Sequence, residues 1–294
     1  MGLQLREAWF VNALLVNVEA WHNVLKKDTD IFSNLDNYLM KQIIGAQSKV
    51  PTELLYLETA AIPIRYVLAS RRTNYLHNIL KREPNELVKR VYIAQKESPT
   101  KGDWIHIIKE DMELLNINMS ETDITKMSKN QFKKHVKTSV KTATFRALRT
   151  LQDNHTKIKH INYNGFRLQP YLQSEKLNSK EVSTLFNMRA DTVNGIKKCF
   201  PKLYENNMQC KLGCLDEDSI RHIYKCKQLG QASIISSEAI YGNELQQVEA
   251  VSEFIRRCSL RSALLADDAS QGQQVLDTST PAAARGARSS AGDS

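Results

Sequence analysis

Four residues whose side chains bind soft metal ions lie close together in this sequence: Cys210, Cys214, His222 and Cys226. Their spacing, C-x3-C-x7-H-x3-C, uses three of the chain's five cysteines. Zinc prefers four sulfur or nitrogen ligands in a tetrahedron, and two short-spaced pairs joined by a turn supply them. Because four protein ligands leave no open coordination position, the pattern predicts a structural zinc ion (Zn2+), not a catalytic one.

Two local elements must position these ligands. Gly213 stands directly before the second cysteine, where it can adopt the positive φ of a tight metal-binding turn. The acidic residues 216–218 are typical of the first turn of a helix, which would place His222 and Cys226 one turn apart on the same face. The alternative interpretation is four unligated residues in a helical turn.

The composition narrows the class of partner and the compartment. The 294 residues carry a formal net charge of +9, which favours an anionic partner, most commonly nucleic acid. Cys199 and Cys258 bring the total number of cysteines to five, an odd number that does not suit a full set of disulfides. Together with the lack of a signal peptide, this favours an intracellular protein, cytoplasmic or nuclear. No stretch reaches the roughly 20 apolar residues of a membrane span, so we expect no membrane partner.

The segment 126–160 carries most of the basic charge. Apolar residues recur in it at intervals of three and four, which predicts a helix with one buried stripe. Lys133, Lys137 and Lys141 form a row at i, i+4, where like charges destabilise an isolated helix. Such a row favours contact with a phosphate backbone, which positions nucleic acid without reading its sequence. A solvated cationic face is the alternative.

Most other segments have helical periodicity. Residues 3–26 place Leu5, Trp9 and Leu14 near one apolar face, and we expect that face to be buried. Further helices are expected over 28–44, from Pro63 until Pro84 ends the run, and over 85–96, 104–115 and 179–194. The helix expected over 243–265 would keep Arg256 and Arg257 outside.

Two segments are expected to differ. Asn164-Gly165 stands between alternating apolar residues, which predicts a small β-hairpin over 158–168. From Asp267 onward the chain is rich in Ala, Ser and Gly, and we expect a disordered tail.

The sequence therefore predicts a mainly α fold with five parts. These are a helical thumb-like and connector region (1–118), a basic helix with hairpin and helix (119–200), a CCHC zinc module (201–230), a C-terminal helix (231–266) and the tail (267–294).

Several blocks of the chain resemble the region that follows the polymerase palm in non-LTR (LINE-type) retrotransposon reverse transcriptases. They span about 5–262 and lie in the family's order, with the Cys/His array near the end. The blocks are Leu54-Leu55-Tyr56-Leu57-Glu58-Thr59, Ile62-Pro63-Ile64-Arg65, Ser70-Arg71-Arg72, Lys101-Gly102-Asp103-Trp104, Tyr171-Leu172, Leu185-Phe186, Met188-Arg189 and Ile240-Tyr241-Gly242-Asn243. The resemblance implies binding of template RNA, target DNA or their hybrid.

Charge and resemblance together nominate a set of basic residues for nucleic-acid contact. They lie in the 70–72 block, along the basic helix and around the Cys/His array. The candidates are Arg71, Arg72, Lys129, Lys133, Lys134, Lys137, Lys141, Arg146, Arg149, Lys211, Arg221 and Lys225.

No residue pattern predicts catalysis by this chain alone. Ala266-Asp267-Asp268 lacks the preceding aromatic residue and the hairpin period of a polymerase motif, and the resemblance would place the palm before Met1. The leading hypothesis is a nucleic-acid-binding fragment without the palm, and the alternative is a zinc-stabilised helical protein-interaction domain. An active polymerase or nuclease built from distant acids, or a decayed element remnant, are further possibilities.

Overall fold

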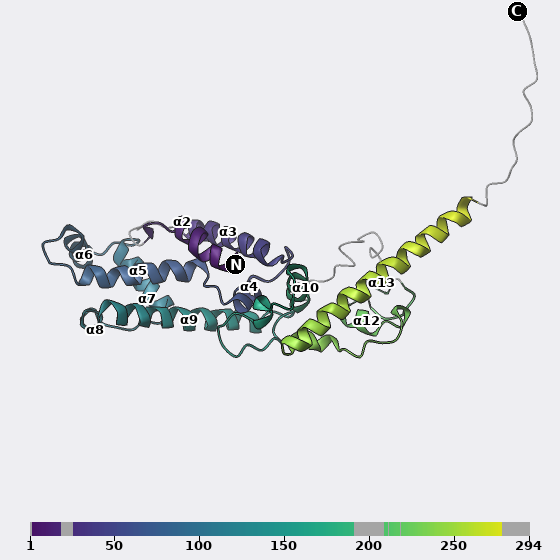
Figure 1. Cartoon of the computed structure of the whole chain (residues 1–294). Coiled ribbons are helices and arrows are strands. Elements are labelled where there is room, and N and C mark those ends of the chain that lie inside the picture. Colours follow the sequence, from purple (N-terminus) through teal and green to yellow (C-terminus); the bar gives the residue numbers. More distant parts are fainter. Residues whose placement is uncertain (1, 19–25, 191–208, 211, 218, 278–294) are drawn as a thin grey trace, which may run out of the picture.

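The computed structural model describes residues 2–18, 26–190, 209–210, 212–217 and 219–277, and these form an elongated array of helices (Figure 1). No strand occurs among them, apart from one antiparallel bridge between Gln209 and Glu217. The main helices are α3 (Lys26–Ile44), α4 (Thr52–Thr59), α5 (Ile64–Leu80), α6 (Leu87–Glu97), α7 (Trp104–Leu114), α8 (Glu121–Lys126), α9 (Lys129–Asp153), α10 (Ser179–Arg189), α12 (Ile220–Lys225) and α13 (Glu244–Asp277). The predicted mainly α fold is confirmed.

The N-terminal segment is helical but not as the sequence predicts. Helices α1 (Gly2–Leu5) and α2 (Asn12–Leu14) flank a π-helical stretch, η1 (Arg6–Val11). Leu5 and Trp9 are exposed, whereas Arg6 is buried and its guanidinium Nε donates to Asp36 Oδ1 at 2.6 Å. The wider π-helical turn changes which side chains share a face, so only the later part of the expected apolar face, at Leu14 and Val18, packs into a core.

Helix α9 is the longest rod in the N-terminal half and lies beside α5 (Figure 1). Ser128 and Gln131 form a capping box at its start, which satisfies backbone N–H groups of the first turn. Its stripe of Phe132, Val136 and Val140 is buried in a core shared with α5, α7 and α8. The predicted basic helix and its buried stripe are therefore present.

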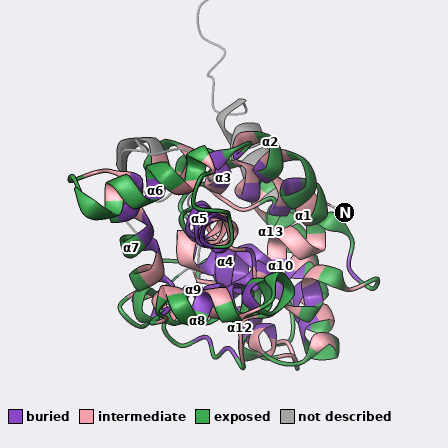
Figure 2. Ribbon diagram, turned by 90° about the vertical axis from the view of Figure 1, so that its left-hand side faces the viewer, coloured by how far each residue is buried: buried purple, intermediate pink, exposed green. Residues whose placement is uncertain are grey.

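A second core joins the C-terminal helices to the middle of the chain. Residues of α4, α10, α12, α13 and the loop after α9 contribute to it, and Leu148 of α9 reaches it as well. Figure 2 shows buried residues gathered around α4 and α5 at the centre of the end-on view. Because α9 contributes to both cores, it couples the two halves of the molecule.

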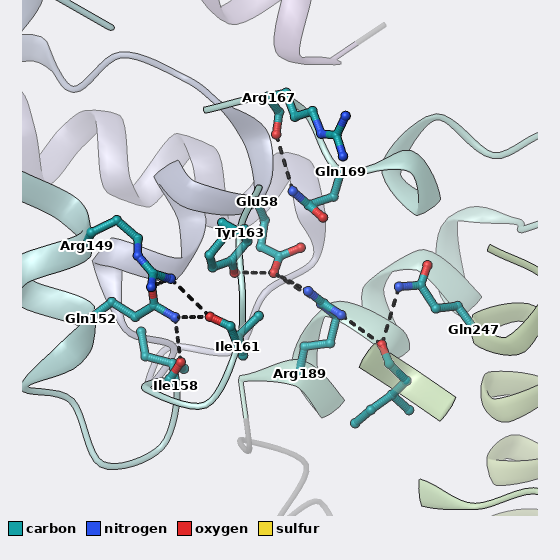
Figure 3. A network of polar contacts seen from close by, with 11 residues as sticks. Glu58, Arg149, Gln152, Ile158, Ile161, Tyr163, Arg167, Gln169, Arg189 and Gln247 are labelled. Carbon is teal, nitrogen blue, oxygen red and sulfur yellow. Dashed lines mark hydrogen bonds and ion pairs between the residues drawn. The ribbon is translucent and has the colours of Figure 1, made fainter. Parts of the chain in front are cut away.

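A buried ion pair between Glu58 and Arg189 lies in the second core (Figure 3). Arg189 Nη2 donates to Glu58 Oε1 at 2.9 Å, and Nη1 donates to the carbonyl oxygen of Ile240 at 2.8 Å. The hydroxyl of Tyr163 donates to the same Glu58 oxygen. Burial, and then the Glu58 carboxylate, raise the pKa of Tyr163 above its usual range, so the hydroxyl stays protonated. This network links α4, the loop after α9, α10 and the segment before α13.

The predicted β-hairpin at 158–168 is wrong. Backbone carbonyl groups of this segment accept hydrogen bonds from α9, and its internal backbone bond, from Ile161 N–H to Ile158 O at 3.1 Å, closes a turn and pairs no strands. The Gln152 side chain of α9 donates to the carbonyl oxygens of Ile158 and Ile161, both at 2.7 Å. Gln169 N–H donates to Glu58 O of α4 at 2.9 Å. Gly165 keeps the positive φ (124°) of a turn, but no strands flank it.

The C-terminal helix is longer than predicted. The backbone of α13 continues to Asp277, past Asp267 where the sequence predicts the tail to begin. The rest of the predicted tail, 278–294, lies outside the described residues. Among the described residues, no helix combines the length and the apolar character that crossing a bilayer requires.

Candidate metal centre and basic surface

The four predicted metal ligands come together in the folded chain. The ligand atoms of Cys210, Cys214, His222 and Cys226 all lie within 4.8 Å of one another. The Sγ atom of Cys226 is 3.9 Å from that of Cys210 and 3.6 Å from that of Cys214. Cys210, His222 and Cys226 are buried, and Cys214 is half-buried.

A tight turn positions the first ligand pair. Gly213, with φ of 86°, donates its N–H to Cys210 O at 3.2 Å. Cys210 N–H in turn donates to Asp216 O at 3.0 Å, which closes the loop beside the Gln209–Glu217 bridge. The loop therefore presents both sulfur atoms to the same point, and the predicted role of Gly213 in the turn is consistent with its φ.

A short helix positions the second pair. The Ser219 hydroxyl accepts a hydrogen bond from His222 N–H at 3.1 Å and so caps α12. Cys226 ends α12, and its N–H donates to His222 O at 2.7 Å. The sequence predicts residues 216–218 as the first turn of this helix. Asp216 and Glu217 instead precede α12, so the prediction is wrong for these two residues. Asp218 lies outside the described residues.

The histidine ring has one nitrogen available for a ligand. His222 Nδ1 lies 3.5 Å from Asp216 Oδ2, whereas Nε2 is buried and makes no hydrogen bond with any described residue. A carboxylate on one ring nitrogen fixes the tautomer that leaves the other nitrogen for a metal ion. Asp216 is therefore a candidate for orienting the His222 ring, a role that the spacing of the four ligands does not indicate.

The donor set is compatible with zinc. Two sulfur atoms bound to one tetrahedral zinc at about 2.3 Å stand roughly 3.8 Å apart, close to the separations found here. Burial, and then the neighbouring Cys214 and Cys210 side chains, raise the pKa of Cys226 to about 12. A bound cation favours the thiolate form that such crowding opposes.

Helix α13 holds this module in place. The buried Arg257 donates from Nε to Glu253 Oε1 at 2.8 Å, and its Nη atoms donate to Cys226 O (3.4 Å) and to Gln231 O. The Tyr224 hydroxyl donates to Ala250 O at 2.7 Å. The prediction that Arg257 faces outward is wrong, because its guanidinium is buried and also donates to the carbonyl oxygen of Ile223 in the last turn of α12, at 3.4 Å.

The second candidate feature is the outward face of α9, here called the basic face. Its six members, Lys129, Lys133, Lys134, Lys137, Lys141 and Arg146, are all exposed. None has an ion-pair partner among the described residues. Since the stripe of Phe132, Val136 and Val140 is buried, Lys133, Lys137 and Lys141 follow one another at one-turn intervals along the exposed part of a fixed helix.

Other predicted nucleic-acid contacts have different roles. Arg72 is buried, and its Nε donates to Asp111 Oδ2 at 2.5 Å, so the prediction for this residue is wrong. Arg71 is half-buried and donates from Nη1 to Leu15 O at 2.6 Å. Arg149 donates to Gln152 Oε1 at 2.7 Å. These three guanidiniums hold helices and loops together, which a linear pattern of charge does not reveal.

Only two of the three basic residues predicted around the Cys/His array, Arg221 and Lys225, lie within the described residues. Arg221 is exposed and its Nη2 lies 3.4 Å from Glu238 Oε1, while Lys225 is exposed and has no ion-pair partner among the described residues. Lys211 lies outside the described residues. The basic face of α9 is therefore the more continuous cationic surface of the described residues.

In comparisons with known proteins, no family model, curated protein or solved structure matches this chain.

Proposed function

We propose that this chain binds nucleic acid through its phosphate backbone, using the basic face of α9. The observation that carries the proposal is the set of six exposed cations on a rigid helix with no carboxylate partner among the described residues. Like charges at i, i+4 repel one another, and an external polyanion relieves that repulsion. Such contacts would position a strand and carry no sequence information.

In this proposal Cys210, Cys214, His222 and Cys226 hold a structural zinc ion. The ion would cross-link the turn at 210–214 to α12 and would neutralise thiolate charge in a buried place. Asp216 would orient the ring of His222 from the side away from the ion. The buried, unpartnered Nε2 atom and the clustered sulfur atoms support this assignment.

We further propose that the chain corresponds to the post-palm region of a non-LTR retrotransposon reverse transcriptase and does not itself catalyse polymerisation. The order of the sequence blocks and the position of the Cys/His array support this parentage. Asp267 and Asp268 lie on the helical backbone of α13 and not in a hairpin of the kind that polymerase palms use. The proposed partners are RNA, DNA or their hybrid.

A protein-interaction domain remains the second candidate function. Leu245, Leu260 and Leu264 of α13 are exposed, at 58%, 41% and 40% of their surface. A partner protein covering these leucines would bind with little dependence on salt, unlike a polyanion.

A gel-shift series tests the proposal against this alternative. Purified, zinc-loaded protein is titrated against RNA, single-stranded DNA and an RNA–DNA hybrid at low salt. Retardation that weakens steeply as salt rises is the expected result, because bound phosphates release counterions. Absence of retardation for all three probes would contradict the proposal.

A further inference from the structure

A groove lies between α5 and the N-terminal end of α9, beside the basic face. It encloses about 350 Å³. Its lining residues are Arg71, Asn74, Tyr75, His77 and Asn78 of α5 together with Lys129, Phe132 and Lys133 of α9. This volume is near the lower end of the roughly 300–1,000 Å³ of small-molecule pockets, which suits one small unit and not a duplex.

The groove is strongly cationic. No Asp or Glu lines it, and α5 contains none along its whole length. Lys129 and Lys133 are exposed and have no ion-pair partner among the described residues. Arg71 stays in place because its two Nη atoms donate to Leu15 O and Asn12 Oδ1, each at 2.6 Å. An anion is therefore the favoured occupant.

The groove also offers amide groups. Asn74 Nδ2 donates to Ser70 O at 2.8 Å, which leaves its Oδ1 as an acceptor. Asn78 is half-buried, and its side-chain amide has no hydrogen bond within the described part of the chain. A carboxamide carries both a donor and an acceptor, and so does the edge of a nucleic-acid base, so the two can form paired hydrogen bonds.

The walls of the groove are fixed by packing. The His77 ring stacks on Phe132 with centroids 5.1 Å apart, and its Nε2 donates to Met127 O at 3.1 Å. Tyr75 packs edge-on against Trp104 at 6.1 Å. Packed walls preserve the shape of the groove before any ligand arrives, which lowers the entropy lost on binding.

We propose that this groove holds a single unpaired nucleotide of the strand that the basic face binds. Its phosphate lies against Lys129 and Lys133, and its base edge meets the amides of Asn74 and Asn78. The inference rests on the proposed function and adds to it a preference for a single-stranded overhang next to a duplex. Unpaired bases expose the edges that such amides recognise.

Two charge-matched variants test the groove. Asn78→Asp places a carboxylate among the cations of the groove, and Asn130→Asp makes the same change on the exposed surface of α9 outside it. Fluorescence anisotropy compares a blunt RNA–DNA hybrid with the same hybrid carrying a single-stranded overhang. The wild-type chain is expected to prefer the overhang by about 10-fold, the order that one or two good hydrogen bonds provide.

The preference for the overhang should disappear in Asn78→Asp. It should persist in Asn130→Asp, which lowers the affinity for both probes by the same factor. Asn78→Ala, which changes no charge, should reduce the preference without changing affinity for the blunt hybrid. Equal wild-type affinity for both probes, or an unchanged preference in both Asn78 variants, would overturn the inference and leave the proposed function standing. If the wild-type chain bound neither probe, both the inference and the proposed function would be contradicted.

Discussion

At the scale of single residues, the metal ligands are the part of the site that the sequence predicts best. Their spacing alone indicates two pairs joined by a turn, and the structure brings all four ligand atoms within 4.8 Å. The role of Asp216 could not be read from spacing, because its carboxylate reaches His222 only once the loop has folded back onto α12.

Loss of one ligand should unfold the module locally. Cys214→Ser removes a thiolate from the cluster, and zinc binding in such sites contributes on the order of 10 kcal/mol to folding. We expect less than stoichiometric zinc and fast amide exchange across 209–230, with α5 and α9 still protected. Metal analysis and hydrogen exchange measure this.

Cys258→Ser is the matched control, because Cys258 lies on α13 outside the ligand cluster. It should retain stoichiometric zinc. Equal loss of protection along the whole chain in Cys214→Ser would show that the module is not a separate folding unit.

Glu253 gives the attachment of the module to α13 a dependence on pH. Hydrogen bonds from Arg256 and then Arg257 hold the pKa of Glu253 at about 2. An unfolded-chain glutamate titrates near about 4.3, so the folded state binds its proton less tightly. The carboxylate therefore stabilises the fold above about pH 4.3, and this stabilisation is lost as the pH falls toward 2.

The difference in unfolding free energy between the wild type and Glu253→Gln measures this contribution. It should be constant near neutral pH and shrink between about pH 4.5 and 2. Since both proteins carry the same metal ligands, acid release of zinc affects them alike. A difference that stays constant over that range would contradict the assigned role.

The burial of two arginine residues, Arg72 and Arg257, could not be predicted from the sequence pattern. Arg72 and Arg257 look like surface cations in the sequence, yet both are buried on acidic partners, Asp111 and Glu253. Glu253 and Arg257 are four apart on one helix, a spacing that could have indicated their pairing. Asp111 lies on another helix, so only the packing of α5 on α7 reveals the pair with Arg72.

At the scale of elements, helices are predictable here because their signals are local. Caps such as Ser128 with Gln131 and the apolar stripe of α9 act within a few residues. The hairpin prediction for 158–168 fails because carbonyl groups of this segment bond to the Gln152 side chain of α9, and the adjoining Gln169 N–H bonds to Glu58 O, a partner far away in the sequence. The Asn164-Gly165 pair indicates a change of chain direction, but it does not determine whether the flanking residues form strands.

The Glu58–Arg189 pair is expected to be a major support of the second core. Arg189→Ala would leave the Glu58 carboxylate buried without its cation, a change that destabilises proteins by about 3–5 kcal/mol. Urea denaturation followed by circular dichroism measures the loss.

Arg167→Ala provides the control, because it also removes a guanidinium near this network but from an exposed position. It should change the unfolding free energy by less than about 0.5 kcal/mol. If Arg189→Ala were equally mild, the network would not hold the helices together.

At the scale of the whole molecule, α9 connects the half that carries the Cys/His cluster to the N-terminal helices. Its buried face enters both cores, and six exposed cations lie along its length. For the proposed function, a helix fixed at both ends would keep those charges at set spacings along a bound strand, which exposed charges on separate loops would not do. The sequence predicts the rod and its charge, whereas its central position follows only from the fold.

The most direct test of this account is the salt dependence of hybrid binding by two triple variants. One replaces Lys133, Lys137 and Lys141 of the basic face with alanine. The other removes the same charge at Lys49, Lys109 and Lys176, which are exposed outside α9. The affinity of each protein for one RNA–DNA hybrid is measured over a series of salt concentrations.

The account predicts that the α9 variant binds more weakly and that its slope of log affinity against log salt is shallower by about 3, since each lost phosphate contact removes about one unit. The control variant should keep the wild-type slope. An α9 variant whose slope and affinity equal those of the wild type would contradict the account.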